Sequence, residues 1–379
     1  MGLPSGKPDH ARRGPGPGRG HGRGQAPPHL RRRQGRRHPG HLILLLSLLL
    51  LGAAPLRAEP LRLAYYDVEL ARDGPALMLQ DVLGGEDPQV AAVLRVIAAV
   101  APDVLVLAGI DWDAEARGLQ ALNAALAAPY PYFFTAEPNA GMPTGLDIDG
   151  NGRLGEARDA QGFGRFTGEG GLAVLSRHPL GAVQDHSALL WRELPGTLMR
   201  GDDPGTGVQR LSSTAHWVLP VDLPGARLHL GIFKATPPVF DGPEDRNGRR
   251  NHDEILFWQR LMAGALPGNL PAPFVILGGA NLDPHLSEGR REAIRGLLED
   301  PRLQDPAPVR PGAEGPQAQA TVDWPSPGPG RLRVDYVLPA LGLRVLGSGV
   351  FWPKEGEALA KEVAVASRHR LVWVDMDLP

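Results

Sequence analysis

The segment from Asp147 to Arg158 carries oxygen-bearing side chains at the spacing of a calcium-binding loop. Asp147, Asp149 and Asn151 occupy the first, third and fifth positions, and Gly152 occupies the sixth, where such loops turn sharply. The twelfth position, normally a glutamate, is Arg158. The spacing therefore predicts a Ca²⁺ site with an incomplete ligand set, and the alternative is a plain Asp- and Gly-rich turn.

A second stretch, residues 240–254, is dense in charged side chains of both signs. Arg249 and His252 are its candidates for binding a substrate phosphate, because both offer donors for charge-assisted hydrogen bonds. The acidic and basic residues nearly balance, so a solvated loop that caps the next helix accounts for the same pattern.

Several kinds of chemistry find no support in the sequence. The 379-residue chain contains no cysteine, which excludes thiol catalysis and cysteine-ligated metals. It has no Walker loop and no dinucleotide-binding glycine fingerprint. No G-x-S-x-G elbow surrounds Ser176, so a serine hydrolase is not indicated.

The formal net charge of −2 averages two very different parts of the chain. Residues 1–58 hold Lys7 and ten arginines against the single acid Asp9, so the remainder carries 29 basic and 41 acidic residues. A body near −12 repels phosphate backbones at long range, which argues against sequence-independent binding of duplex nucleic acid.

The basic front also contains the uncharged apolar stretch Leu42–Ala54. This stretch is shorter than the roughly 20 residues of a membrane-spanning helix and fits the core of a signal peptide. We expect a disordered basic leader plus signal peptide over residues 1–58, cleavage after Ala58, and export to the periplasm or the extracellular space. The alternative is an uncleaved membrane anchor; after processing, no stable membrane span is expected.

The rest of the chain, residues 59–379, alternates between helical and strand patterns and is predicted to form one domain. We expect strands over residues 61–66, 104–110, 171–176, 211–220, 227–235, 274–278, 331–338, 343–350 and 370–376. We expect helices over residues 88–100, 117–127, 251–265 and 288–299. This order predicts an α/β fold in which mixed β-sheets are covered by helices.

Seven segments occur in an order that resembles the endonuclease/exonuclease/phosphatase superfamily, also called the DNase I-like fold. They are the strand that ends at Asp67, PDVLVLAGI (102–110), GGLAVLSRHPL (170–180), LHLGIFKATPP (228–238), FVILGGANLDP (274–284), RVDYVLP (333–339) and ASRHRLVWVDMDL (366–378). The resemblance implies a four-layer α/β sandwich with two packed mixed β-sheets flanked by helices. It also implies hydrolysis of phosphoesters with Mg²⁺, Mn²⁺ or a similar hard cation at the strand ends.

The polar positions of this family are only partly kept. Asn281, Asp335 and His369 match the family pattern. The other positions are changed: the strand-end Asn is Asp67, the metal-binding Glu is Gly109, the His after the hairpin is Lys234, the Asp of Gly-Asp-x-Asn is Gly279, and the Asp of Ser-Asp-His is Arg368.

Neighbouring carboxylates offer a way to compensate for these losses. Residues two apart in a strand face the same side, which places Asp111 and Asp113 in phase with Gly109 and Asp283 in phase with Asn281. By the same rule Glu69 is in phase with Asp67. The candidate metal ligands are thus Asp67, Asp111 and Asp335, and the candidate catalytic residues are His369, Asn281, Asp283 and Lys234. The alternatives are turn acids, a solvated lysine and a structural histidine.

The sequence therefore supports two main hypotheses. The first is an exported, divalent-metal-dependent phosphoesterase of nuclease or phosphatase type with a divergent active site, acting on a small-molecule or nucleic-acid phosphoester. The second is a non-catalytic relative that binds a ligand or partner through the former active-site cleft. A Ca²⁺-stabilised extracellular binding module is a third possibility. No protein partner is predicted.

Overall fold

A computed structural model of the chain describes residues 60–377. These residues belong to one compact unit, Ala58–Pro379. The predicted leader and signal peptide lie outside the described residues. None of the described helices is both long and apolar enough to cross a membrane.

One β-sheet has six strands in the order β12-β13-β1-β2-β4-β3. Its strands are β1 (Leu61–Asp67), β2 (Val104–Ile110), β3 (Tyr132–Thr135), β4 (Gly171–Ser176), β12 (Arg344–Val350) and β13 (Val372–Asp377). Strands β1 and β2 are parallel, whereas the other neighbours are antiparallel. The first two strands, β1 and β2, therefore lie in the middle of this sheet, and the last strand, β13, lies beside β1.

The other large sheet has five strands in the order β11-β8-β7-β6-β5. Its strands are β5 (Gln184–Asp185), β6 (His216–Leu223), β7 (Ala226–Lys234), β8 (Phe274–Gly279) and β11 (Asp335–Pro339). Strands β6 and β7 form the predicted hairpin, and β7 and β8 are parallel. A small ladder of β9 (Val322–Trp324) and β10 (Gly330–Leu332) lies apart from both sheets.

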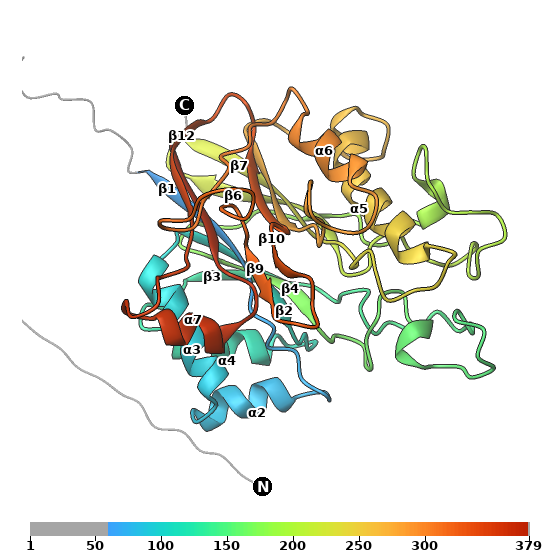
Figure 1. Cartoon of the computed structure of the whole chain (residues 1–379), viewed down its shortest axis with the longest axis horizontal. Helices are drawn as coiled ribbons and strands as arrows, with labels where there is room; N and C mark the ends of the chain where they lie inside the picture. Colours follow the sequence, from blue (N-terminus) through green and yellow to red (C-terminus); the bar gives the residue numbers. More distant parts are fainter. Residues whose placement is uncertain (1–59, 378–379) are drawn as a thin grey trace, which may run out of the picture. The chain divides into compact units, whose positions relative to one another are not determined.

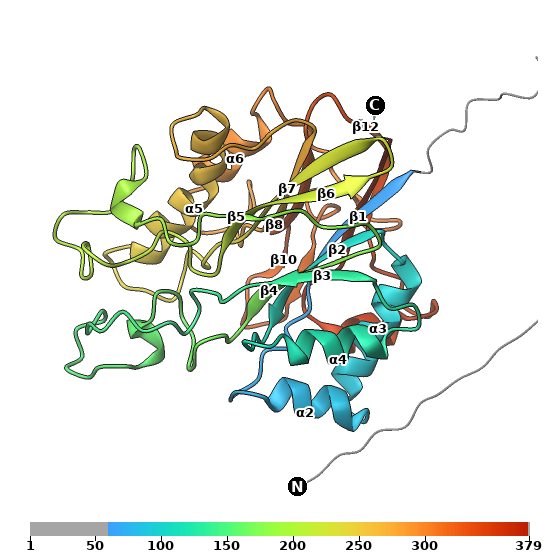
Figure 2. The same cartoon turned by 180° about the vertical axis from the view of Figure 1, so that it is seen from behind.

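The two large sheets pack face to face, and helices cover their outer faces (Figures 1 and 2). Alternating residues of β1 show the layering: Leu63 and Tyr65 belong to the core between the sheets, whereas Ala64 and Tyr66 face helices. The helices α2 (Leu77–Gly84), α3 (Pro88–Val100), α4 (Arg117–Ala125) and α7 (Ala360–Ala366) cover the six-stranded sheet. The helices α5 (Arg246–Met262) and α6 (Glu292–Leu298) cover the five-stranded sheet. The predicted four-layer α/β sandwich is confirmed.

Some predicted boundaries were wrong. Helix α5 begins at Arg246, five residues before the predicted start, so part of the expected charged loop is helical. The buried Arg250 side chain explains this difference, because its guanidinium donates to the carbonyls of Leu211 and Ser212 and draws the first helical turn inward. Charge density had suggested a solvated loop, but these contacts place the segment in the interior. Strand β6 begins at His216 rather than at residue 211.

Candidate functional site

Six charged residues meet where strands of the two sheets end, and we call them the strand-end cluster: Asp67, Glu69, Lys234, Asp335, Arg368 and His369. Strand β1 ends at Asp67, and strand β7 ends at Lys234. The pairing of β8 with its two neighbours places Gly279 beside both Lys234 and Asp335. The fold therefore brings the polar ends of separate segments to one place, as the family pattern implies.

The carboxylate of Asp67 is occupied by a cation of the protein itself. The Lys234 Nζ lies 2.7 Å from Asp67 Oδ2, and the Asp67 residue is only 3% exposed. Burial would raise the pKa of Asp67, but Lys234 and His369 outweigh that effect and lower it. Burial would lower the pKa of Lys234, but the nearby Asp67 carboxylate outweighs burial and raises this pKa. Both groups are thus charged at neutral pH and neutralise each other.

His369 and Asp335 form a second buried pair. The His369 Nδ1 lies 2.8 Å from Asp335 Oδ2, and the Trp324 ring packs nearly perpendicular to the imidazole with centroids 5.5 Å apart. Burial would lower the pKa of His369, but Asp335 and then Asp67 raise it to about 9. Because the Asp67 carboxylate also favours a proton on the His369 imidazole, we assign His369 as an imidazolium and Asp335 as a carboxylate.

Glu69 is held by a third pair at the edge of the cluster. The Arg368 backbone N–H donates to Glu69 Oε2 at 2.7 Å, and the Arg368 Nε donates to Oε1 at 2.9 Å. The Ser367 hydroxyl donates to the Asp67 carbonyl at 2.7 Å and ties the two segments together. Each of the three acids in the cluster therefore has its own protein cation.

Two glycines mark the positions where the family has carboxylates. Gly109 has φ +70°, and a Cβ there would overlap Asp67 Oδ1 and lie 2.9 Å from the Glu69 backbone nitrogen. A Cβ at Gly279 would lie 2.7 Å from the Tyr65 hydroxyl. Larger side chains at these positions would collide with Asp67 and Tyr65 as they are placed here.

The structure does not bring the two compensating carboxylates to the cluster. The Asp111 oxygens accept the backbone N–H groups of Arg72 and Gly170. The Asp283 oxygens accept three backbone N–H groups, from His285, Leu286 and Arg333. Both carboxylates are held by backbone N–H groups, and among the described residues Asp67, Asp111 and Asp335 do not form a group with ligand atoms within 4.8 Å of one another.

Asn281 and the two candidate phosphate-binding residues also have structural partners. The Asn281 side-chain amide donates to the Ala235 carbonyl at 2.7 Å, just beyond Lys234. The Arg249 guanidinium forms a buried, two-pronged pair with Asp203 at 2.6 and 2.7 Å. The His252 Nδ1 lies 2.8 Å from Asp253 Oδ1. Asn281 thus lies close to Lys234, whereas Arg249 and His252 support the packing of α5.

The predicted calcium loop forms a tight turn with clustered carboxylates. Oxygens of Asp147, Asp149 and Asp159 lie within 4.8 Å of one another, and this is the one such group of acids or histidines among residues 60–377. Asn151 donates its amide to Asp149 and Glu156 rather than turning its oxygen toward this group. In the structure, the third candidate ligand is therefore Asp159 and not Asn151. The sequence spacing had not assigned Asp159 as a ligand.

The sequence analysis noted Glu69 as a carboxylate in phase with Asp67 and Ser367 as part of the terminal motif, but it assigned neither a role in the site, and it missed Tyr65. Glu69 shares the strand parity of Asp67, and this was the available signal for it. No local pattern indicates that the Tyr65 hydroxyl lies beside Gly279, because the two residues are far apart in the chain.

Comparisons with known proteins identify the fold and the family. A model of the "Endonuclease/Exonuclease/phosphatase family" matches residues 81–369. An endonuclease/exonuclease/phosphatase of Beutenbergia cavernae is 20% identical with a TM-score of 0.53, and the match covers 84% of this chain and 72% of that one. The human nocturnin catalytic domain is 14% identical (TM-score 0.47, covering 84% and 95%), and sphingomyelinase C of Streptomyces griseocarneus is 19% identical (0.45, covering 83% and 99%). Among curated proteins, no sequence matches this chain.

Proposed function

The chain belongs to the endonuclease/exonuclease/phosphatase family, and on that premise we propose that it is a non-catalytic member that binds a phosphoester ligand at the strand-end cluster. Members of this family are phosphoesterase- or nuclease-type hydrolases that generally depend on a divalent metal. The observation that carries the proposal is the 2.7 Å contact between Lys234 Nζ and Asp67 Oδ2. A protein ammonium takes the carboxylate that a catalytic cation would need.

A divalent cation has little to bind at this cluster. Mg²⁺ and Mn²⁺ prefer free oxygen ligands, and in the cluster each carboxylate already contacts a cation of the protein. Binding a metal would require breaking an ion pair whose carboxylate is buried and leaving the Lys234 ammonium without its partner, which is costly. His369 is also unsuited to be a base, because its raised pKa keeps it protonated at neutral pH.

The same residues offer cations to an anionic ligand. Lys234 keeps 22% of its side chain exposed and Arg368 keeps 61%. A phosphoester would accept charge-assisted hydrogen bonds from these two groups. The proposal assigns Lys234 and Arg368 as the ligand contacts, with Asp67 and Glu69 as the residues that position them.

A hydrolysis and binding panel tests the proposal. The protein is mixed with 4-nitrophenyl phosphate or bis(4-nitrophenyl) phosphate, with Mg²⁺, Mn²⁺ or Ca²⁺, and we expect no release of nitrophenolate above the protein-free blank. Calorimetry should show binding of the monoester that is weakened by Arg368→Gln. Arg227→Gln is the matched control, because it removes an equally exposed arginine paired with Asp222. Undiminished binding in Arg368→Gln would overturn the ligand site.

The alternative is the metal-dependent phosphoesterase with a divergent site. It is favoured if hydrolysis depends on added Mg²⁺ or Mn²⁺ and is lost in both Asn281→Ala and His369→Ala. The family membership supports this alternative, whereas the pairing of Asp67 with Lys234 opposes it.

We further propose that the turn at 147–159 binds Ca²⁺ through Asp147, Asp149 and Asp159. The support is the convergence of their oxygens within 4.8 Å, which suits a hard cation with oxygen ligands. Calorimetry with Ca²⁺ at millimolar concentrations should show one site that is lost in Asp149→Asn. The absence of any heat in the wild-type protein would remove this assignment.

Export is a separate proposal that rests on the sequence of residues 1–58. The short apolar stretch Leu42–Ala54 after a basic region supports a cleaved signal peptide. Mass spectrometry of the protein from its native cell should give a mature N-terminus near Glu59. A mature protein that begins at Met1 would contradict export by this route.

A further inference from the structure

Three arginines from separate segments converge on the ring of Trp352. The guanidinium carbons of Arg310, Arg331 and Arg370 lie 4.6, 5.4 and 4.4 Å from the ring centre. Arg310 lies in the connection before β9, Arg331 in β10, and Arg370 just before β13. Cation–π attraction explains the contact of one arginine with the indole ring. Three guanidinium groups at the same ring also repel one another.

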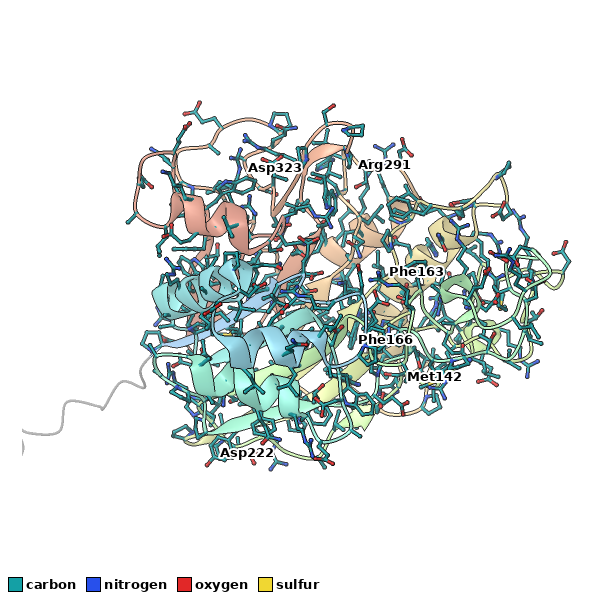
Figure 3. The ribbon with its side chains drawn as sticks, turned by 90° about the horizontal axis from the view of Figure 1, so that it is seen from below. Met142, Phe163, Phe166, Asp222, Arg291 and Asp323 are labelled. Carbon is teal, nitrogen blue, oxygen red and sulfur yellow. The ribbon has the colours of Figure 1, made fainter. Side chains whose placement is uncertain are left out.

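The positive charge of this group is only partly compensated. Asp323 faces Arg331 across the small ladder and accepts a hydrogen bond from its Nε at 3.0 Å; Figure 3 labels Asp323. Among the described residues, the Arg310 guanidinium donates to the Gln317 carbonyl, and the Arg370 guanidinium donates to the carbonyls of Ser367 and His369. Asp323 also lies close enough to Arg310 and Arg370 to interact with their charges, so this one carboxylate faces three guanidinium groups.

The buried member of the group has a donor without a partner. Arg370 is 6% exposed, and its Nε has no hydrogen-bond partner among the described residues. A buried N–H group without an acceptor costs about 1–3 kcal/mol, so such a group indicates a missing acceptor. An anion with several oxygens would offer acceptors to the three guanidinium groups at once.

This group is distinct from the strand-end cluster, although the chain passes from one to the other. His369 pairs with Val322 in a β-bridge and turns its ring to Trp324 and Asp335. Arg370 follows it directly and reaches Trp352. The two groups share no residue, although Glu69 of the strand-end cluster lies close enough to Arg370 to interact with its charge.

We propose that Arg310, Arg331 and Arg370, supported by Trp352, form a second binding site that takes a phosphate group. Arginine suits this task because its planar fork donates two parallel hydrogen bonds to phosphate oxygens. The site requires no metal and no catalytic group. It would bind free phosphate or the phosphate of a larger ligand, and it does not depend on the function proposed for the strand-end cluster.

Calorimetry with inorganic phosphate and with glycerol 3-phosphate tests this site in the full-length protein. All titrations use Arg368→Gln as the background, in which binding at the strand-end cluster is weakened. We expect saturable binding with one site per chain, weakened at least about tenfold by Arg310→Gln and by Arg331→Gln, because each removes a charge-assisted hydrogen bond. Arg227→Gln serves as the matched control and should bind as the background protein does. Binding of both compounds would indicate a free-phosphate site, and binding of glycerol 3-phosphate alone would indicate a site for an esterified phosphate.

Arg310→Gln and Arg331→Gln alter partly or largely exposed side chains, so both proteins should fold, and circular dichroism checks this. Absence of saturable binding of either compound in the background protein would overturn the proposal. Equal binding in the background protein, Arg310→Gln and Arg331→Gln would overturn it as well. Loss of phosphate binding in Arg310→Gln and Arg331→Gln would support the proposal. This result is independent of the proposed function if Arg368→Gln still weakens the binding of 4-nitrophenyl phosphate.

Discussion

The Lys234 ammonium lies 2.7 Å from Asp67 Oδ2, at the point where strands of the two sheets end. This contact joins the last residue of β1 to the last residue of β7 and neutralises the carboxylate nearest to Gly109. The chain therefore keeps the family fold, but a carboxylate that could contact a metal is paired with a lysine of the protein.

Removal of Lys234 should therefore destabilise the protein strongly. Lys234→Met leaves Asp67 charged, buried and unpaired, and we expect a loss of about 3–5 kcal/mol in the free energy of unfolding by urea. The double variant Asp67→Asn with Lys234→Met should recover part of this loss. Arg227→Gln, which breaks an exposed pair, should cost less than about 1 kcal/mol. Equal losses of unfolding free energy in Lys234→Met and Arg227→Gln would contradict the buried pairing of Lys234 with Asp67.

The stability of the protein should fall as the pH rises through the range set by His369. Its pKa is raised to about 9 in the folded state, against 6.5 for an unperturbed histidine. The stabilisation is thus fully present below about pH 6.5 and is lost as the pH approaches 9, up to about 3 kcal/mol. Urea unfolding at pH 6.5, 7.5 and 9 measures this loss, and His369→Gln should flatten the profile. An unchanged profile in that variant would show that other groups cause it.

Gly109 should tolerate no side chain. Gly109→Ala forces a Cβ into contact with Asp67 Oδ1 at a backbone φ of +70°, and we expect a loss of about 2 kcal/mol or more. Gly342→Ala is the matched control, because a Cβ there has open space around it. Thermal unfolding of both variants distinguishes them; a neutral Gly109→Ala would mean that Asp67 moves aside easily.

Arg249 should matter for stability and not for ligand binding. Arg249→Met leaves Asp203 buried without its partner, and we expect a loss of about 3–5 kcal/mol in unfolding free energy. The folded variant should bind 4-nitrophenyl phosphate as the wild-type protein does, which calorimetry below the unfolding temperature measures. Weaker binding with unchanged stability would restore Arg249 as a phosphate contact.

The elements that position the site could be predicted because their signals are local. The buried strand at 104–110 and the helix at 88–100 match β2 and α3 as the structure has them. The pairing of side chains could not be predicted in the same way. Strand parity placed Asp111 and Asp283 in phase with the site, but backbone N–H groups in distant turns take their oxygens. Which acceptor a carboxylate finds depends on tertiary contacts that spacing does not describe.

Arg249 illustrates the same limit from the opposite direction. Charge density in 240–254 favoured an exposed loop, whereas the first turns of α5 bury Arg249 against Asp203. Asp203 lies 46 residues earlier in the chain, so no local pattern connects the two. In contrast, the convergence of Asp147 and Asp149 could be anticipated, because their spacing within a single turn determines it.

The measurement that tests the central claim most directly is the hydrolysis of bis(4-nitrophenyl) phosphate with and without Mg²⁺ or Mn²⁺. Because Lys234 occupies the Asp67 carboxylate, we predict that the rate with either metal equals the protein-free blank. A metal-dependent rate above the blank, abolished in both Asn281→Ala and His369→Ala, would contradict the account and identify the chain as an active phosphoesterase.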